Sequence, residues 1–131
     1  MKEPIRLVID TNSLFMNFYN PEGNSAKIIE LAENGKIILF SPDTVKEELF
    51  RVMKKELVIE DWLIIERIES LPINWIDHEI YRNFLDKTKV KHEPDKPIEA
   101  VALLLNCEIL SADKHFANRA NINKIIKIAS D

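Results

Sequence analysis

Residues 5–12 read IRLVIDTN, an apolar run that ends in an aspartate and two further polar residues. The segment Ile5 to Ile9 is short and rich in β-branched residues, as expected for a parallel strand that is buried on both faces. Asp10 therefore lies at the carboxyl end of the predicted strand, which is the edge where open α/β sheets bind their ligands. This segment indicates both the fold class and the first candidate site residue.

Further short apolar runs follow along the chain and alternate with longer helical segments. The predicted strands are Ile5 to Ile9, Lys36 to Phe40, Ile73 to Ile76, Glu108 to Leu110 and Ile125 to Ile128. The predicted helices cover Ser13 to Tyr19, Ser25 to Asn34, Pro42 to Lys55, Glu60 to Leu71, His78 to Lys87 and Lys96 to Leu105. Such alternation predicts a three-layer α/β/α fold, Rossmann-like, with a central parallel sheet of about five strands.

Length and composition limit the class of the protein. The 131 residues fit one domain over residues 1–131, and the net charge of −4 argues against a surface that binds nucleic acid everywhere. The apolar runs are much shorter than the ~20 residues that span a bilayer, and Met1-Lys2-Glu3-Pro4 does not resemble a secretory signal. We expect a cytoplasmic protein without a membrane segment, in which the single cysteine, Cys107, is a core residue.

Carboxylates on separate elements form the candidate site. Asp10 ends the first strand, Asp113 follows the strand Glu108 to Leu110, and Asp95 precedes the helix that Pro97 helps to begin. Asp95 has a simpler interpretation as a helix cap. Clustered carboxylates repel one another without a cation, and hard oxygen ligands suit Mg²⁺ or Mn²⁺. Such an ion can activate water and stabilise the leaving oxygen of a phosphodiester.

The helix Pro42 to Lys55 supplies a fourth candidate acid. Glu48 lies at the margin of its apolar face, whereas Glu47 projects about 100° further towards solvent. A carboxylate beside the core is therefore Glu48, although an ion pair with Arg51 would explain it equally well. Arg51 and Lys55 continue along the same side, where they would hold substrate phosphates or form a solvated face.

Four motifs in this order resemble the PIN-domain family. They are LVIDTN at residues 7–12, VKEEL at 45–49, PDKPIEAVAL at 94–103 and ILSADKHF at 109–116. The resemblance covers nearly the whole chain and implies a parallel α/β fold with Mg²⁺- or Mn²⁺-dependent ribonuclease activity, as in VapC toxins and RNA-processing endonucleases. It also implies single-stranded RNA as substrate and, for a toxin, a small antitoxin partner.

The resemblance assigns roles to individual residues. Asp10, Glu48, Asp95 and Asp113 become the four catalytic and metal-binding acids. Thr11, Asn12 and Ser111 match polar positions that orient water or substrate, although helix capping or a turn hydrogen bond explains them equally well. Glu99 is an auxiliary acid outside the predicted ligand set. His115 and Asn118 stand where some members carry a further acid.

Other interpretations remain open at this point. A PIN-like module that binds RNA or protein without cutting has the same fold. A phosphatase that forms an aspartyl-phosphate also begins with an aspartate after the first strand, but it requires a second aspartate where this chain has Asn12. The segments Glu60 to Leu71 and Ser13 to Tyr19 carry more apolar residues than one helix face needs, which suits core packing, a homodimer or an antitoxin contact.

Overall fold

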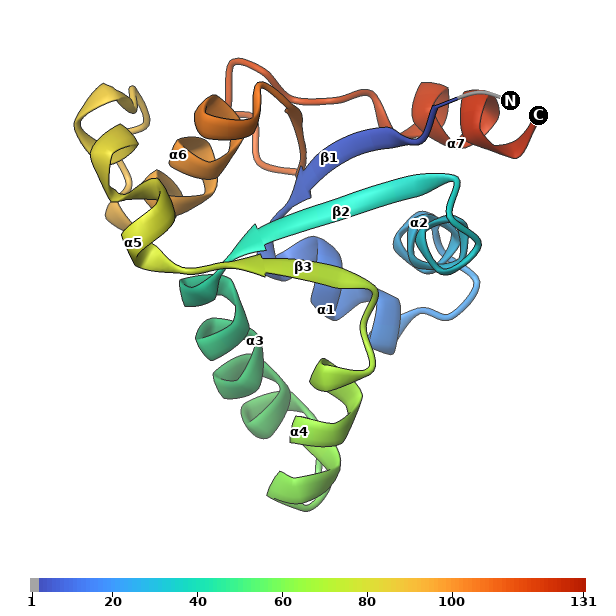
Figure 1. The fold of residues 1–131 in the computed structure, drawn as a ribbon. Coiled ribbons are helices and arrows are strands. Elements are labelled where there is room, and N and C mark those ends of the chain that lie inside the picture. The colour runs from blue at the N-terminus through green and yellow to red at the C-terminus, as the bar shows by residue number, and fades with distance from the viewer. Residues whose placement is uncertain (1–2) are drawn as a thin grey trace.

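A parallel sheet forms the centre of residues 3–131, the part of the chain that this computed structural model describes (Figure 1). Its strands are β1 (Ile5–Ile9), β2 (Ile37–Pro42), β3 (Ile73–Ile76) and β4 (Glu108–Leu110), in the order β3-β2-β1-β4. Every neighbouring pair is parallel; Val8 of β1, for example, is in register with Phe40 of β2 and Ile109 of β4. The carboxyl ends of all four strands therefore meet at one edge.

Helices cover both faces of the sheet, as the sequence predicts (Figure 1). On one side lie α1 (Thr11–Tyr19), α2 (Asn24–Glu33), α3 (Asp43–Glu56) and α4 (Asp61–Glu69). On the other side lie α5 (His78–Tyr81), the 3₁₀ segments Arg82–Lys87 and Glu93–Asp95, and α6 (Lys96–Leu105). The helix predicted over His78 to Lys87 is thus α-helical only in its first turn. The predicted three-layer α/β/α class is confirmed.

The C-terminal segment corrects one prediction. The strand predicted at Ile125 to Ile128 is wrong, because these residues belong to helix α7 (Ile122–Ser130), which packs against α2. The side chain of Asn121 caps this helix by accepting a hydrogen bond from the Lys124 N–H at 3.1 Å. Ile122, Ile125 and Ala129 recur at helical spacing and face the protein, a period that a four-residue window cannot distinguish from a strand.

The core lies on both faces of the sheet. Leu7, Val8 and Ile9 of the central strand are almost completely buried, and α6 contributes the small residues Ala100 and Ala102, which let this helix approach the sheet closely. Cys107 is a buried free thiol whose pKa is raised by burial, so its prediction as a core residue is confirmed. No helix in residues 3–131 is both long and apolar enough to cross a membrane.

Candidate metal centre

Asp10 connects the first strand to the first helix at the carboxyl edge of the sheet. Its Oδ1 accepts a hydrogen bond from the Ser13 N–H at 2.9 Å and caps α1, and its Oδ2 accepts one from the Ser111 hydroxyl. One residue earlier, the Ile9 carbonyl accepts a 2.6 Å hydrogen bond from the buried Ser41 hydroxyl, which ties the end of β1 to β2. Asp10 is only 7% exposed, and each of its two carboxylate oxygens accepts a hydrogen bond, so its position is fixed.

Ser111 links Asp10 to the loop that carries Asp113. While its hydroxyl donates to Asp10, its oxygen accepts the Asp113 N–H at 2.9 Å. The loop returns to β4, where the Ile109 N–H donates to the Asn118 carbonyl at 3.0 Å and the Ala120 N–H donates to the Ile109 carbonyl at 2.8 Å. These contacts fix Asp113 relative to Asp10 through backbone and side-chain hydrogen bonds.

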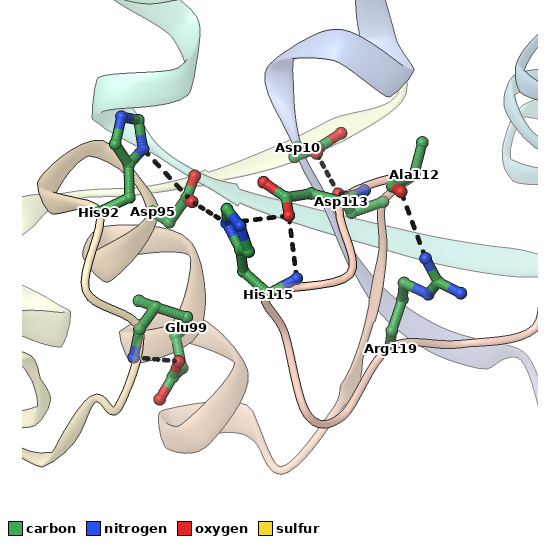
Figure 2. Close-up of polar contacts among 10 residues, drawn as sticks. Asp10, His92, Asp95, Glu99, Ala112, Asp113, His115 and Arg119 are labelled. Atoms are coloured by element: carbon green, nitrogen blue, oxygen red, sulfur yellow. Dashed lines mark hydrogen bonds and ion pairs between the residues drawn. The ribbon is translucent and has the colours of Figure 1, made fainter.

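Asp95 stands at the beginning of α6 but does not cap it. Its side chain accepts no helix-capping hydrogen bond, and its buried Oδ2 accepts no hydrogen bond from any of residues 3–131. The surrounding groups are His92 Nδ1 at 3.4 Å and His115 Nδ1 at 3.9 Å from that oxygen (Figure 2). Burial, together with the charge of Asp113, raises the pKa of Asp95, while the two histidines act in the opposite direction. A buried carboxylate oxygen without a donor is costly unless a cation compensates it.

Asp95, Asp113 and His115 together satisfy the distances of a metal site. Each offers one ligand atom, and these atoms lie within 4.8 Å of one another. His115 Nδ1 is 3.0 Å from Asp113 Oδ1, a separation that suits neighbouring ligands of an octahedral ion with bonds of about 2.1 Å. The unpartnered oxygen of Asp95, the like charge of Asp113 and the hard oxygen donors all fit a divalent cation.

Comparison with known proteins identifies the family to which this fold belongs. The family model described as "PIN domain" matches residues 7–122. The chain belongs to the PIN-domain family. A chain of the solved structure "VapBC2 from Rickettsia felis bound to a DNA fragment from their promoter" has a similar fold, with a TM-score of 0.58 at 18% identity, over 88% of this chain and 96% of that chain. No curated protein sequence matches the chain.

Glu48, the fourth predicted acid of this PIN domain, has no hydrogen bond or ion pair to the other three acids in the described part of the chain. Glu48 is half-buried on α3, as expected from its helical position, and Glu47 is exposed. Among the described residues, Glu48 forms no hydrogen bond or ion pair, so the alternative pair with Arg51 is not formed. Arg51 lies in a groove between α3 and α4. A role for Glu48 as a ligand stays a prediction.

The supporting polar residues occupy different environments. Thr11 is buried at the first position of α1, whereas Asn12 is exposed and borders a cleft of about 490 Å³ together with Ser111 and Arg119. Ser111 forms the turn hydrogen bond that is one of its predicted alternatives, because its oxygen accepts the Asp113 N–H; its hydroxyl also donates to Asp10, a contact that the sequence does not predict.

Two features of this site go beyond the sequence prediction. Glu99 is buried and uses both oxygens on backbone groups: Oε1 accepts the Lys89 N–H at 2.6 Å and Oε2 accepts the Val90 N–H at 3.3 Å. It therefore holds a loop and is not free to bind an ion. His115 stands where some family members carry a further acid, and its spacing of two residues from Asp113 places it beside the acids (Figure 2).

Replacing Asp95 with Asn is expected to stabilise the metal-free protein. The folded-state pKa of Asp95 is raised, so the ionised carboxylate destabilises the folded state above that pKa, and this penalty disappears as the pH falls through it. Urea unfolding in EDTA at about pH 8 should show a gain on the order of 1 kcal/mol. At acidic pH the gain should vanish. A variant that is less stable than the wild type in EDTA would contradict this account.

Proposed function

We propose that this PIN domain is a metal-dependent endoribonuclease that hydrolyses RNA phosphodiester bonds, with Mg²⁺ or Mn²⁺ held at its acidic cluster. The observation that carries the proposal is the buried, unpartnered Oδ2 of Asp95 beside Asp113 and His115. Membership in the PIN-domain family supports it, because the resemblance of the motifs implies a nuclease that uses carboxylates in this order. No nucleophilic side chain is required when water is the nucleophile.

The residues of this chain divide the work in a definite way. Asp95 and Asp113 would hold the ion. Asp10 would complete the group of acids, because Ser111 connects it to Asp113: the Ser111 hydroxyl donates to Asp10, and its oxygen accepts the Asp113 N–H. When bound, a divalent cation supplies Lewis-acid chemistry that activates water and offsets negative charge on the phosphate. Glu48 is proposed as the fourth acid, and Arg51 and Lys55 as candidate phosphate contacts on α3. The protein's own contribution is to fix the carboxylates before substrate arrives.

The proposal is tested by incubating labelled single-stranded RNA with purified protein in Mg²⁺, in Mn²⁺ and in EDTA. The expected result is endonucleolytic cleavage with either ion and none in EDTA. A preparation carrying Asp10→Asn controls for contaminating ribonuclease, because it should be inactive under every condition. Intact RNA in all three conditions, across several RNA sequences, would instead identify a PIN-like module that binds without cutting.

A second candidate role, as the toxin of a toxin–antitoxin pair, concerns the surface of α3 and α4. Trp62 and Ile65 are 64% and 50% exposed, and Ile65 lines a groove with Phe50 and Arg51. Exposed apolar surface of this kind suits a partner protein or a homodimer. The similar solved structure is described as a VapBC2 assembly, which favours the antitoxin. The role would be supported if an adjacent gene encodes a short DNA-binding protein and if that protein co-purifies with this chain. A chain that purifies as a monomer and has no such neighbouring gene would contradict it.

His115 is expected to influence which ion the site prefers. An imidazole nitrogen favours Mn²⁺ over Mg²⁺, which prefers oxygen ligands. Replacing His115 with Asp should therefore lower the ratio of Mn²⁺ to Mg²⁺ affinity by about tenfold, within the range known for changes around metal sites. Isothermal titration calorimetry with each ion measures this ratio without relying on activity. His78→Asp, an exposed histidine on α5, is the control. An unchanged ratio in His115→Asp would exclude His115 from the ion.

A further inference from the structure

A hollow of about 530 Å³ lies beside the acidic cluster and is lined largely by basic residues. Its wall consists of Lys89, Val90, Lys91, His92 and His115, which we refer to as the basic hollow. The segment that contributes most of this wall, residues 87–91, contains three lysines in a chain of net charge −4. Positive charge is therefore concentrated here against the overall sign of the protein.

The basic hollow and the acidic cluster share part of their boundary. His92 Nδ1 is 3.4 Å from Asp95 Oδ2, and His115 Nδ1 is 3.0 Å from Asp113 Oδ1. Both histidines also line the hollow. A chain of phosphates with one group at the carboxylates would therefore pass directly into the hollow. Arg51 lines a different depression, the groove between α3 and α4.

The two lysines of the hollow are available to an incoming anion. Lys89 and Lys91 are exposed, and neither forms an ion pair with another described residue. Nearby lysines are engaged: Lys87 lies over the Phe84 ring at 4.8 Å, and Lys96 pairs with Glu93 at 2.7 Å. Each lysine that neutralises a phosphate releases condensed counterions, which gives affinity and a characteristic salt dependence.

The wall of the basic hollow is fixed from beneath. Glu99 on α6 accepts hydrogen bonds from the backbone N–H groups of Lys89 and Val90 at 2.6 and 3.3 Å, and the Val90 side chain is buried. The backbone that carries the lysines is therefore anchored to the helix that follows Asp95. A preformed wall loses less conformational entropy on binding than a loop that must first become ordered.

We propose that the basic hollow binds the phosphodiester backbone of single-stranded RNA next to the site of cleavage, with Lys89 and Lys91 as the phosphate contacts. This inference rests on the proposed function and names where its substrate binds. It adds phosphate contacts on the loop that Glu99 anchors to the candidates Arg51 and Lys55 of α3.

The test is RNA binding, measured as fluorescence anisotropy of a labelled oligouridylate of roughly 12 nucleotides in Mg²⁺. The full chain with Asp10→Asn is the background, so that the RNA stays intact. Lys89→Glu/Lys91→Glu is compared with the matched variant Lys124→Glu/Lys127→Glu, which reverses two exposed lysines of α7. We expect the hollow variant to raise Kd by at least about tenfold and to reduce the log–log salt slope by about 1 to 1.5, because two phosphate contacts are lost. The α7 variant should change Kd less than about twofold.

The outcomes separate this inference from the proposed function. If the background protein and the wild type in EDTA both fail to bind RNA, the proposed function is refuted, and the RNA-binding role of the basic hollow is refuted with it. If the background binds RNA and both charge-reversal variants bind equally well, or the α7 variant loses more affinity, only the basic hollow is refuted. Displacement of the RNA by polyglutamate at equal charge concentration would assign the hollow to an acidic protein partner and would also overturn the proposal. Circular dichroism of each variant verifies that these exposed substitutions leave the fold intact.

Discussion

Replacing Asp113 with Asn is expected to reduce RNA cleavage at saturating Mg²⁺ by roughly 10³-fold. A ligand to the ion contributes several kcal/mol of charge stabilisation in the transition state, and about 1.4 kcal/mol corresponds to each tenfold change in rate. Asn keeps the size of the side chain and one oxygen but removes the negative charge that the cluster uses to hold a cation. The loop itself should survive, because Ser111 contacts the backbone N–H of this residue, and the remaining oxygen of Asn can still accept the hydrogen bond that the His115 N–H donates to Asp113 Oδ1 at 2.9 Å.

The measurement is the single-turnover rate of RNA cleavage, determined for wild type and Asp113→Asn at several Mg²⁺ concentrations. The matched control is Asp86→Asn, an exposed acid of the segment Arg82–Lys87 that forms no ion pair in the described residues. That variant should cleave at the wild-type rate. If Asp113→Asn retained activity within tenfold of wild type, Asp113 would not be a ligand, and the assignment of the cluster would have to change.

Replacing Glu99 with Ala is expected to lower the free energy of unfolding by about 3 kcal/mol. This carboxylate is 8% exposed and accepts both of its hydrogen bonds from backbone N–H groups. Its removal leaves the N–H groups of Lys89 and Val90 without their acceptor and opens a cavity beside α6. Because the charged acceptor is buried, little of this interaction is screened by solvent.

Urea unfolding monitored by circular dichroism gives the stability, and amide hydrogen exchange reports whether the loop has loosened. Exchange at Lys89 and Val90 should accelerate in Glu99→Ala more than exchange in the strands of the sheet. Glu93→Ala is the comparison, because Glu93 lies in the 3₁₀ segment Glu93–Asp95 just before α6, is exposed, and pairs with Lys96 on the surface. A stability within about 0.5 kcal/mol of wild type for Glu99→Ala would show that the buried contact is not an anchor.

The fold could be predicted largely from the sequence because its elements have clear periodicities. The segments Ile5–Ile9 and Ile73–Ile76 form strands over the predicted residues, and Lys96–Leu105 forms a helix over the predicted residues. The C-terminal segment was assigned wrongly because KIIKI fits a strand as well as a helix in a short window. Its packing against α2, which is distant in sequence, decides the structure.

How well the sequence predicts the candidate site differs from residue to residue. Asp10 and Asp113 follow strands, so the topology alone brings them to one edge of the sheet. The contribution of His115 depends on how the loop after β4 folds back, which is set by hydrogen bonds between Ile109 and the residues near Arg119. The position of Glu48 relative to the other acids depends on the orientation of α3, and no motif specifies that orientation.

Glu99 shows why some functional contacts escape a reading of the sequence. On α6 it lies one helical turn after Asp95, which suggests an auxiliary acid on the same face. In the folded protein its oxygens meet the backbone of Lys89 and Val90, which are up to ten residues away in the sequence and belong to an irregular loop. Loop conformations of this kind carry no periodic signal. The basic hollow is therefore a feature of the structure more than of the sequence pattern.

The central claim is that Asp95, Asp113 and His115 enclose a divalent cation, and anomalous diffraction tests it most directly. Crystals of the full chain grown with Mn²⁺ would be measured at a wavelength where manganese scatters anomalously. The account predicts a peak at a coordination distance of about 2 Å from an oxygen of Asp95 and an oxygen of Asp113. A Mn²⁺-containing crystal whose only peaks lie elsewhere, with Asp95 Oδ2 still unpartnered, would contradict the assignment of this cluster as the metal centre.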